Sequence, residues 1–122
     1  MFDRELVFNS LNQVKTLVDT IEKRTANIND VDDFRCSHDG MLLLDAVCMN
    51  LIDIGEATKN LDKVSNGELL PQYPEIQWNG IMRMRDKIAH HYFEIDAEVV
   101  LLTVKEDIPL VRTTIEKMIS NL

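Results

Sequence analysis

Arg85 and His90, five residues apart, are the side chains in this sequence whose types and spacing most suggest chemistry. Arginine binds phosphate through paired hydrogen bonds and stabilises negative charge that develops on it. Histidine titrates near neutral pH and can therefore transfer protons. Such a pair needs no metal when the substrate supplies its own nucleophile, as RNA does through its 2′-hydroxyl. Asp86 could orient either partner, and Tyr92 could hydrogen-bond the phosphate or a base.

The spacing of apolar residues predicts that Arg85 lies on an amphipathic helix beginning at Pro74. On an ideal helix Arg85 falls inside the apolar arc, between Ile81 and Tyr92. A guanidinium is rarely buried without a partner, because its desolvation is costly. We therefore expect Arg85 either to line a polar cleft or to pair with an internal carboxylate such as Glu56.

The position of His90 constrains how this helix can end. Five residues correspond to a rotation that leaves the side chains of Arg85 and His90 about 140° apart. The two can act together only if the helix ends or bends near Ala89, or if a second chain completes the pair. In the other reading, His90 is an ordinary solvated residue at the end of a helix.

Other common kinds of site are not supported by the sequence. It contains no glycine-rich phosphate loop and no nucleophile elbow of a serine hydrolase. The adjacent His90 and His91 point apart in regular structure, which disfavours a zinc site. Cys36 and Cys48 lack the spacing of a metal or disulfide framework. We expect no metal and no cofactor.

Composition indicates one domain spanning residues 1–122, with enough chain to bury a sizeable core. The formal net charge of −8 argues against bulk attraction to nucleic acid, although a local positive pocket around Arg83, Arg85 and Lys87 remains compatible with it. No signal peptide follows Met1, and no apolar run is long enough to span a membrane. These features favour a reduced, cytoplasmic compartment.

The hydrophobic pattern predicts an all-α fold, an antiparallel up-down bundle of four main helices. The expected helices cover about Phe2 to Arg24, Ser37 to Lys63, Pro74 to Ala89, and Asp96 to the end of the chain. In the second helix, Gly55 suggests the close approach of another backbone. In the fourth, Pro109 should produce a kink about one turn earlier. Apolar residues on most faces of the second helix suggest the centre of a bundle or a dimer seam.

The segment Arg85–Tyr92 resembles the R-x4-H-x-Y signature of toxins of the HepT type, which contain a HEPN domain. The resemblance extends over most of the chain from the second helix to the fourth, in the family order. The further matching segments are Leu44–Val47, Asn50–Ala57, Tyr73–Trp78 and Tyr92–Asp96.

This resemblance implies a homodimer in which two copies of the motif line one cleft. It implies a metal-independent endoribonuclease, with RNA as substrate, acting in a type VII-like toxin–antitoxin system. The antitoxin would be a minimal nucleotidyltransferase (MNT) that transfers AMP to Tyr92. In such a protein Arg85 holds the scissile phosphate, His90 transfers a proton, Asp86 orients them, and Glu56 has a supporting role.

Two other readings remain open. In one, the chain is a non-catalytic HEPN module that binds a nucleotide or a partner within a nucleotidyltransferase complex. In the other it is a bare helical dimerisation domain, which would leave the placement of Arg85 unexplained.

Overall fold

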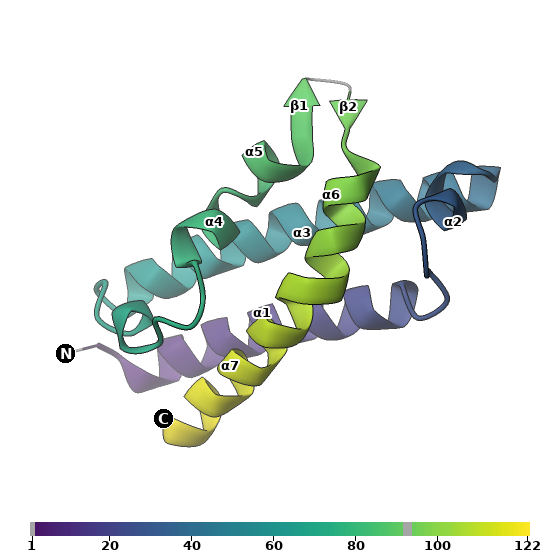
Figure 1. The fold of residues 1–122 in the computed structure, drawn as a ribbon. Coiled ribbons are helices and arrows are strands. Elements are labelled where there is room, and N and C mark those ends of the chain that lie inside the picture. Colours follow the sequence, from purple (N-terminus) through teal and green to yellow (C-terminus); the bar gives the residue numbers. More distant parts are fainter. Residues whose placement is uncertain (1, 92–93) are drawn as a thin grey trace.

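The computed structural model describes residues 2–91 and 94–122 and is helical apart from one short hairpin (Figure 1). The elements in chain order are α1 (Arg4–Arg24), α2 (Asp32–Arg35), α3 (His38–Val64), the 3-10 helix η1 (Leu70–Gln72), α4 (Trp78–Met82), α5 (Met84–Ile88), β1 (Ala89–His91), β2 (Glu94–Ile95), α6 (Ala97–Leu102), the π-helix η2 (Thr103–Asp107) and α7 (Ile108–Asn121).

The two longest helices, α1 and α3, begin where the sequence provides caps. The side chain of Asp3 accepts hydrogen bonds from the backbone N–H groups of Glu5 and Leu6. The Ser37 hydroxyl accepts one from the backbone of Gly40. These contacts satisfy N–H groups that have no partner within the helix. The predicted bounds of both helices are confirmed to within two residues.

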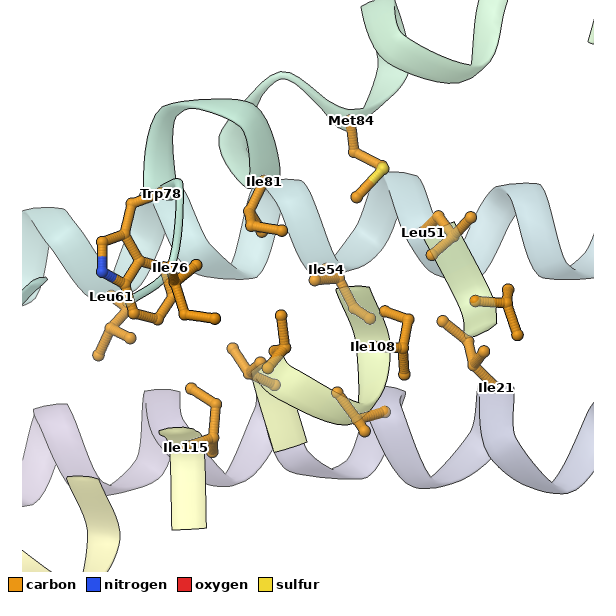
Figure 2. Packing of buried hydrophobic residues seen from close by; sticks show 14 of the residues in the cluster. Ile21, Leu51, Ile54, Leu61, Ile76, Trp78, Ile81, Met84, Ile108 and Ile115 are labelled. Carbon is orange, nitrogen blue, oxygen red and sulfur yellow. The ribbon is translucent and has the colours of Figure 1, made fainter. Parts of the chain in front are cut away.

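Helix α3 lies at the centre of the arrangement, with α1 on one side and α4, α5 and α6 on others (Figure 1). The core is a continuous cluster of apolar side chains, most of them aliphatic, to which all of these helices contribute. In Figure 2, Met84 and Ile81 point from α5 and α4 toward α3, while Ile115 of α7 lies near α1. Burial of this cluster supplies the main driving force for the fold.

The last helical stretch is one bent path made of α6, η2 and α7 (Figure 1). Asp96, at the predicted start of this stretch, caps it by accepting a hydrogen bond from the backbone N–H of Val99. Its π-helical segment ends at Asp107, two residues before Pro109. Because proline cannot donate the hydrogen bond that an α-helix requires at that point, the preceding turn adopts the wider geometry. The predicted distortion near Pro109 is confirmed.

An arginine ties this bent helix to α1. Arg112 of α7 donates hydrogen bonds to Asp19 and Glu22 of α1, and to Glu116 one turn further along α7. The hydrogen bond to Asp19 contributes most to raising the pKa of Arg112 above its usual value. Such a charge-assisted network fixes the crossing of two helices that are distant in sequence.

The all-helical class is confirmed, but the third predicted helix is wrong. Residues 74–77 form turns, and the helical part is split into α4 and α5. The predicted link around Glu94 instead pairs with residues after α5 as a small antiparallel ribbon. Within the described residues, no helix is both long and apolar enough to cross a membrane.

Candidate functional site

The candidate site is built on α5, a five-residue helix that carries Arg85. Met84 and Ile88 anchor this helix to the core, since both side chains are almost completely buried. Gly55 of α3 allows α4 and α5 to come close to α3. A Cβ at position 55 would lie 2.9 Å from the Ile81 carbonyl oxygen and 3.4 Å from the Met84 Cβ. The close backbone contact predicted for Gly55 is therefore confirmed, and it places α4 and α5 directly on α3.

A break at Arg83 decides where Arg85 points. Helix α4 ends at Met82, and Arg83 has a φ of −102° and a ψ of 27°, outside helical values. The helix resumes at Met84 as α5. The angular positions of side chains calculated for one continuous helix therefore do not apply to Arg85. Arg85 is exposed, and the prediction that it lies within the apolar arc is wrong.

Arg85 has no partner within the part of the chain that the structure describes. Glu56, the internal acid considered for it, is exposed and binds Lys59 at 3.1 Å on its own helix. Asp86 is exposed beside Arg85 on α5. The guanidinium is therefore available to an external anion, and Glu56 is not joined to it.

Helix α5 ends directly before Ala89, which is one of the two ways in which Arg85 and His90 were expected to be able to act together. Its last residue is Ile88, and the backbone then enters β1, in which Ala89 pairs with Ile95 and His91 with Glu94. The backbone N–H of Asp96 donates to the Ile88 carbonyl at 2.9 Å. Arg85 and His90 therefore do not lie on one unbroken helix, and the angle of about 140° calculated for such a helix does not apply to them.

The structure describes one of the predicted site residues, His90, only in part and another, Tyr92, not at all. The backbone of His90 lies in β1, but its side chain falls outside what the structure describes, as does that of His91. Tyr92 lies outside the described residues altogether. The placement of these groups relative to Arg85 stays a prediction.

One charged contact near the motif was missed by the sequence analysis. Lys87 of α5 forms an ion pair of 2.5 Å with Asp107, the last residue of η2. The two residues are 20 positions apart, and no local pattern links them. A basic residue within the motif and an acid preceding Pro109 were the only signals available.

The two cysteines do not favour thiolate chemistry. Burial raises the pKa of the Cys48 thiol to about 12. Cys36 is exposed, but the negative charge of Asp32 raises its pKa as well. Because the thiolate is the reactive form, neither residue is poised as a nucleophile. Among the described residues, no three His, Cys, Asp or Glu side chains gather where they could hold a metal ion.

Fold and site together define a largely helical protein with an exposed arginine on the short helix that directly precedes a strand carrying two histidines. The family described as "Ribonuclease HepT-like" matches residues 14–118. The chain therefore belongs to the HepT-like ribonuclease family, as the resemblance of its motif implied.

Individual relatives agree with this assignment. A "Probable ribonuclease HepT" of Thermococcus cleftensis is 37% identical over 108 residues, which cover 88% of this chain and 91% of the relative. A "Putative RNase" of Methanocaldococcus jannaschii is 38% identical over 77 residues, covering 63% of this chain and 60% of the relative. A longer protein of that organism, "Gamma-glutamylcyclotransferase and putative RNase", is 34% identical over 112 residues, 92% of this chain but 47% of the relative. No solved structure matches the chain significantly.

Proposed function

We propose that the chain is a metal-independent endoribonuclease that cleaves RNA by attack of the 2′-hydroxyl on the adjacent phosphate. One observation carries this proposal: Arg85 is exposed and without a described partner on a helix that stops two residues before His90. A cation in that state can bind a phosphate without first breaking an internal ion pair, which would lower its affinity.

The reaction requires only groups that the motif and the substrate provide. The 2′-hydroxyl loses its proton and its oxygen forms a bond to phosphorus, while the bond from phosphorus to the 5′-oxygen breaks and that oxygen gains a proton. The products are a 2′,3′-cyclic phosphate and a 5′-hydroxyl. Arg85 stabilises the negative charge on the phosphoryl oxygens, His90 transfers a proton, and Asp86 orients them. In this proposal Glu56 acts from α3 only as a supporting residue.

We further propose that two copies of the chain form the active unit. The outer face of α3 supports this, because Met41, Leu42 and Met49 are each more than half exposed, at 55%, 55% and 59%. Clusters of exposed apolar side chains on a single helix face are typical of association surfaces. In a homodimer arranged about this helix, the motifs of both copies would line one cleft.

The regulation follows from the family resemblance. We propose that the protein is the toxin of a type VII-like toxin–antitoxin pair in the cytoplasm. Its cognate MNT-type nucleotidyltransferase would transfer AMP to Tyr92 and silence cleavage. Adding that group would bring negative charge and bulk into the motif, in competition with the RNA phosphate.

Cleavage of RNA in the presence of EDTA tests the activity. We expect the purified chain to produce 2′,3′-cyclic phosphate ends, and Arg85→Ala and His90→Ala each to reduce the rate by at least about a hundredfold. Arg35→Ala, which removes an exposed arginine on α2, is the matched control and should retain full activity. Cleavage that persists in both motif variants would refute the proposed site. Stoichiometric nucleotide binding without RNA turnover would indicate a non-catalytic module instead.

Intact mass of the protein expressed with and without its neighbouring nucleotidyltransferase tests the regulation. We expect an adenylyl increment that maps to Tyr92 and disappears in Tyr92→Phe. An unchanged mass in the presence of an active nucleotidyltransferase would remove this part of the proposal while leaving the cleavage assay untouched.

A further inference from the structure

The ion pair between Lys87 and Asp107 joins the motif helix to a distant part of the chain. The Nζ of Lys87 lies 2.5 Å from Oδ2 of Asp107, and the two side chains are 39% and 38% exposed. Lys87 is two residues after Arg85 and three before His90, so the contact falls inside the motif itself.

Helix α5 needs external restraints, because five residues are too few for a helix that is stable by itself. Met84 and Ile88 hold one side of it against α3 and the core. On a helix Lys87 projects about 200° from Arg85, nearly to the opposite side. Lys87 therefore restrains rotation of α5 about its axis while leaving the face that carries Arg85 open.

The other end of the ion pair is well fixed. Asp107 directly precedes Ile108, which is completely buried, and follows by three residues Val104, which is 5% exposed. The wider π-helical turn that ends at Asp107 belongs to the same bent helix as α7. Asp107 is thus an anchor on a rigid element, and π-helical turns are often found where a helix serves a site.

We infer that the Lys87–Asp107 ion pair is a positioning element, which holds α5 and the start of β1 so that Arg85 and His90 act on one phosphodiester. This inference rests on the proposed ribonuclease function. The role of the pair is to fix an orientation, because exposed ion pairs contribute little to global stability. Small displacements of a group that acts on a substrate are costly for the rate.

Lys87 has two competing possible roles, positioning of α5 and direct contact with the RNA backbone. The variant Asp107→Asn distinguishes these two roles. If Asp107 positions α5 through Lys87, the change lowers kcat, since the restraint is weakened. If Lys87 binds RNA, freeing it from Asp107 leaves kcat unchanged and lowers KM, because the cation becomes available to phosphate.

Steady-state RNA cleavage and amide hydrogen exchange of residues 84–91 test the inference in the full chain. We expect Asp107→Asn and Lys87→Met each to lower kcat about tenfold with KM within about twofold. Amide exchange in that segment should rise about tenfold. Melting temperatures should stay within about 3 °C of the unaltered protein. The exchanged pair, Lys87→Asp with Asp107→Lys, should recover most of the lost kcat and protection.

Glu22→Gln is the matched control, since it breaks another partly exposed pair, Arg112–Glu22, whose residues lie on α7 and α1 and not on α5 or η2. It should leave kcat and the exchange of residues 84–91 unchanged. Unaltered kcat and exchange in Asp107→Asn would overturn the inference, as would a raised KM at constant kcat in Lys87→Met. If the unaltered chain does not cleave RNA, the proposed function falls and this inference with it. If it does, and Arg85→Ala is inactive while Asp107→Asn is not, only the inference falls.

Discussion

Gly55 of α3 lies so close to the carbonyl of Ile81 in α4 that no larger residue fits without movement. A Cβ built on Gly55 would be 2.9 Å from that oxygen. Real Cβ atoms essentially never approach backbone oxygen so closely, and backbone cannot move aside as easily as a side chain. The glycine therefore determines how near the helices that carry the motif can come to α3.

We predict that Gly55→Ala destabilises the protein by about 1–3 kcal/mol, because overpacking outweighs the gain in helix propensity. Gly80→Ala in α4 is the matched control, since its Cβ would meet only the Gln77 Cβ at 3.8 Å. That change should stabilise the fold by up to about 1 kcal/mol. Urea unfolding of both variants measures the difference. Equal effects of the two alanines would contradict the role assigned to the close approach.

Asp33 gives a prediction for the dependence of stability on pH. Its carboxylate accepts hydrogen bonds from the backbone N–H groups of Asn29, at 2.7 Å, and Asp30, at 3.2 Å. These bonds lower the pKa of Asp33 below the usual value of an aspartate. Because the folded state has the lower pKa, the stabilisation is complete above the unfolded value and is lost as the pH falls through the folded one.

We expect Asp33→Asn to be less stable than the unaltered protein at neutral pH, with the gap closing below about pH 4. Urea unfolding from pH 7 to pH 2 measures this gap, and NMR titration of the Asp33 carboxyl measures its pKa directly. If the difference in stability stays constant from pH 7 to pH 2, the loop does not favour the carboxylate form of Asp33 over its protonated form.

The sequence was sufficient for the parts of the fold that depend on local signals. Ser37 and Asp96 each precede an apolar repeat, and each caps the helix that follows. The cap at Asp3 was not predicted, because the first helix was expected to begin at about Phe2. Gly55 was identifiable because a glycine inside a helix has a cost that close packing can offset. Pro109 was identifiable because a missing N–H has a definite effect on the preceding turn.

The sequence was not sufficient where tertiary packing decides. Pro74 and Glu75 look like a helix start, yet the chain makes turns there and becomes helical only at Trp78, whose Nε1 donates to the Tyr73 carbonyl at 2.8 Å. Nothing in the local pattern marks Arg83 as a break, so the orientation of Arg85 was wrong. The motif spacing and the family resemblance could be read from sequence, whereas the Lys87–Asp107 contact required the folded chain.

Arg112 provides a test of the contact between the first and last helices. We predict that Arg112→Met lowers the free energy of unfolding by about 1 kcal/mol, because the change leaves Asp19 and Glu22 without their shared cation. The loss should shrink in high salt, since all the groups involved are partly exposed to solvent. Lys59→Met, which removes a more exposed pair within α3, should have a smaller effect. Urea unfolding at low and high salt checks both variants, and equal losses in the two would argue against a network.

Thr103, in the π-helical turn, has a buried hydroxyl that is left without a hydrogen-bond partner among the described residues. Thr58, equally buried in α3, donates to the Ile54 carbonyl four residues earlier at 2.7 Å. An unpaired buried hydroxyl costs about 1–3 kcal/mol, so replacing it by a methyl group should recover part of that cost. We predict that Thr103→Val raises the free energy of unfolding by about 1 kcal/mol, while Thr58→Val gives no gain because a hydrogen bond is lost. Urea unfolding of the two variants measures the contrast. A loss of stability in Thr103→Val as large as that in Thr58→Val would mean that the Thr103 hydroxyl has a partner in solution.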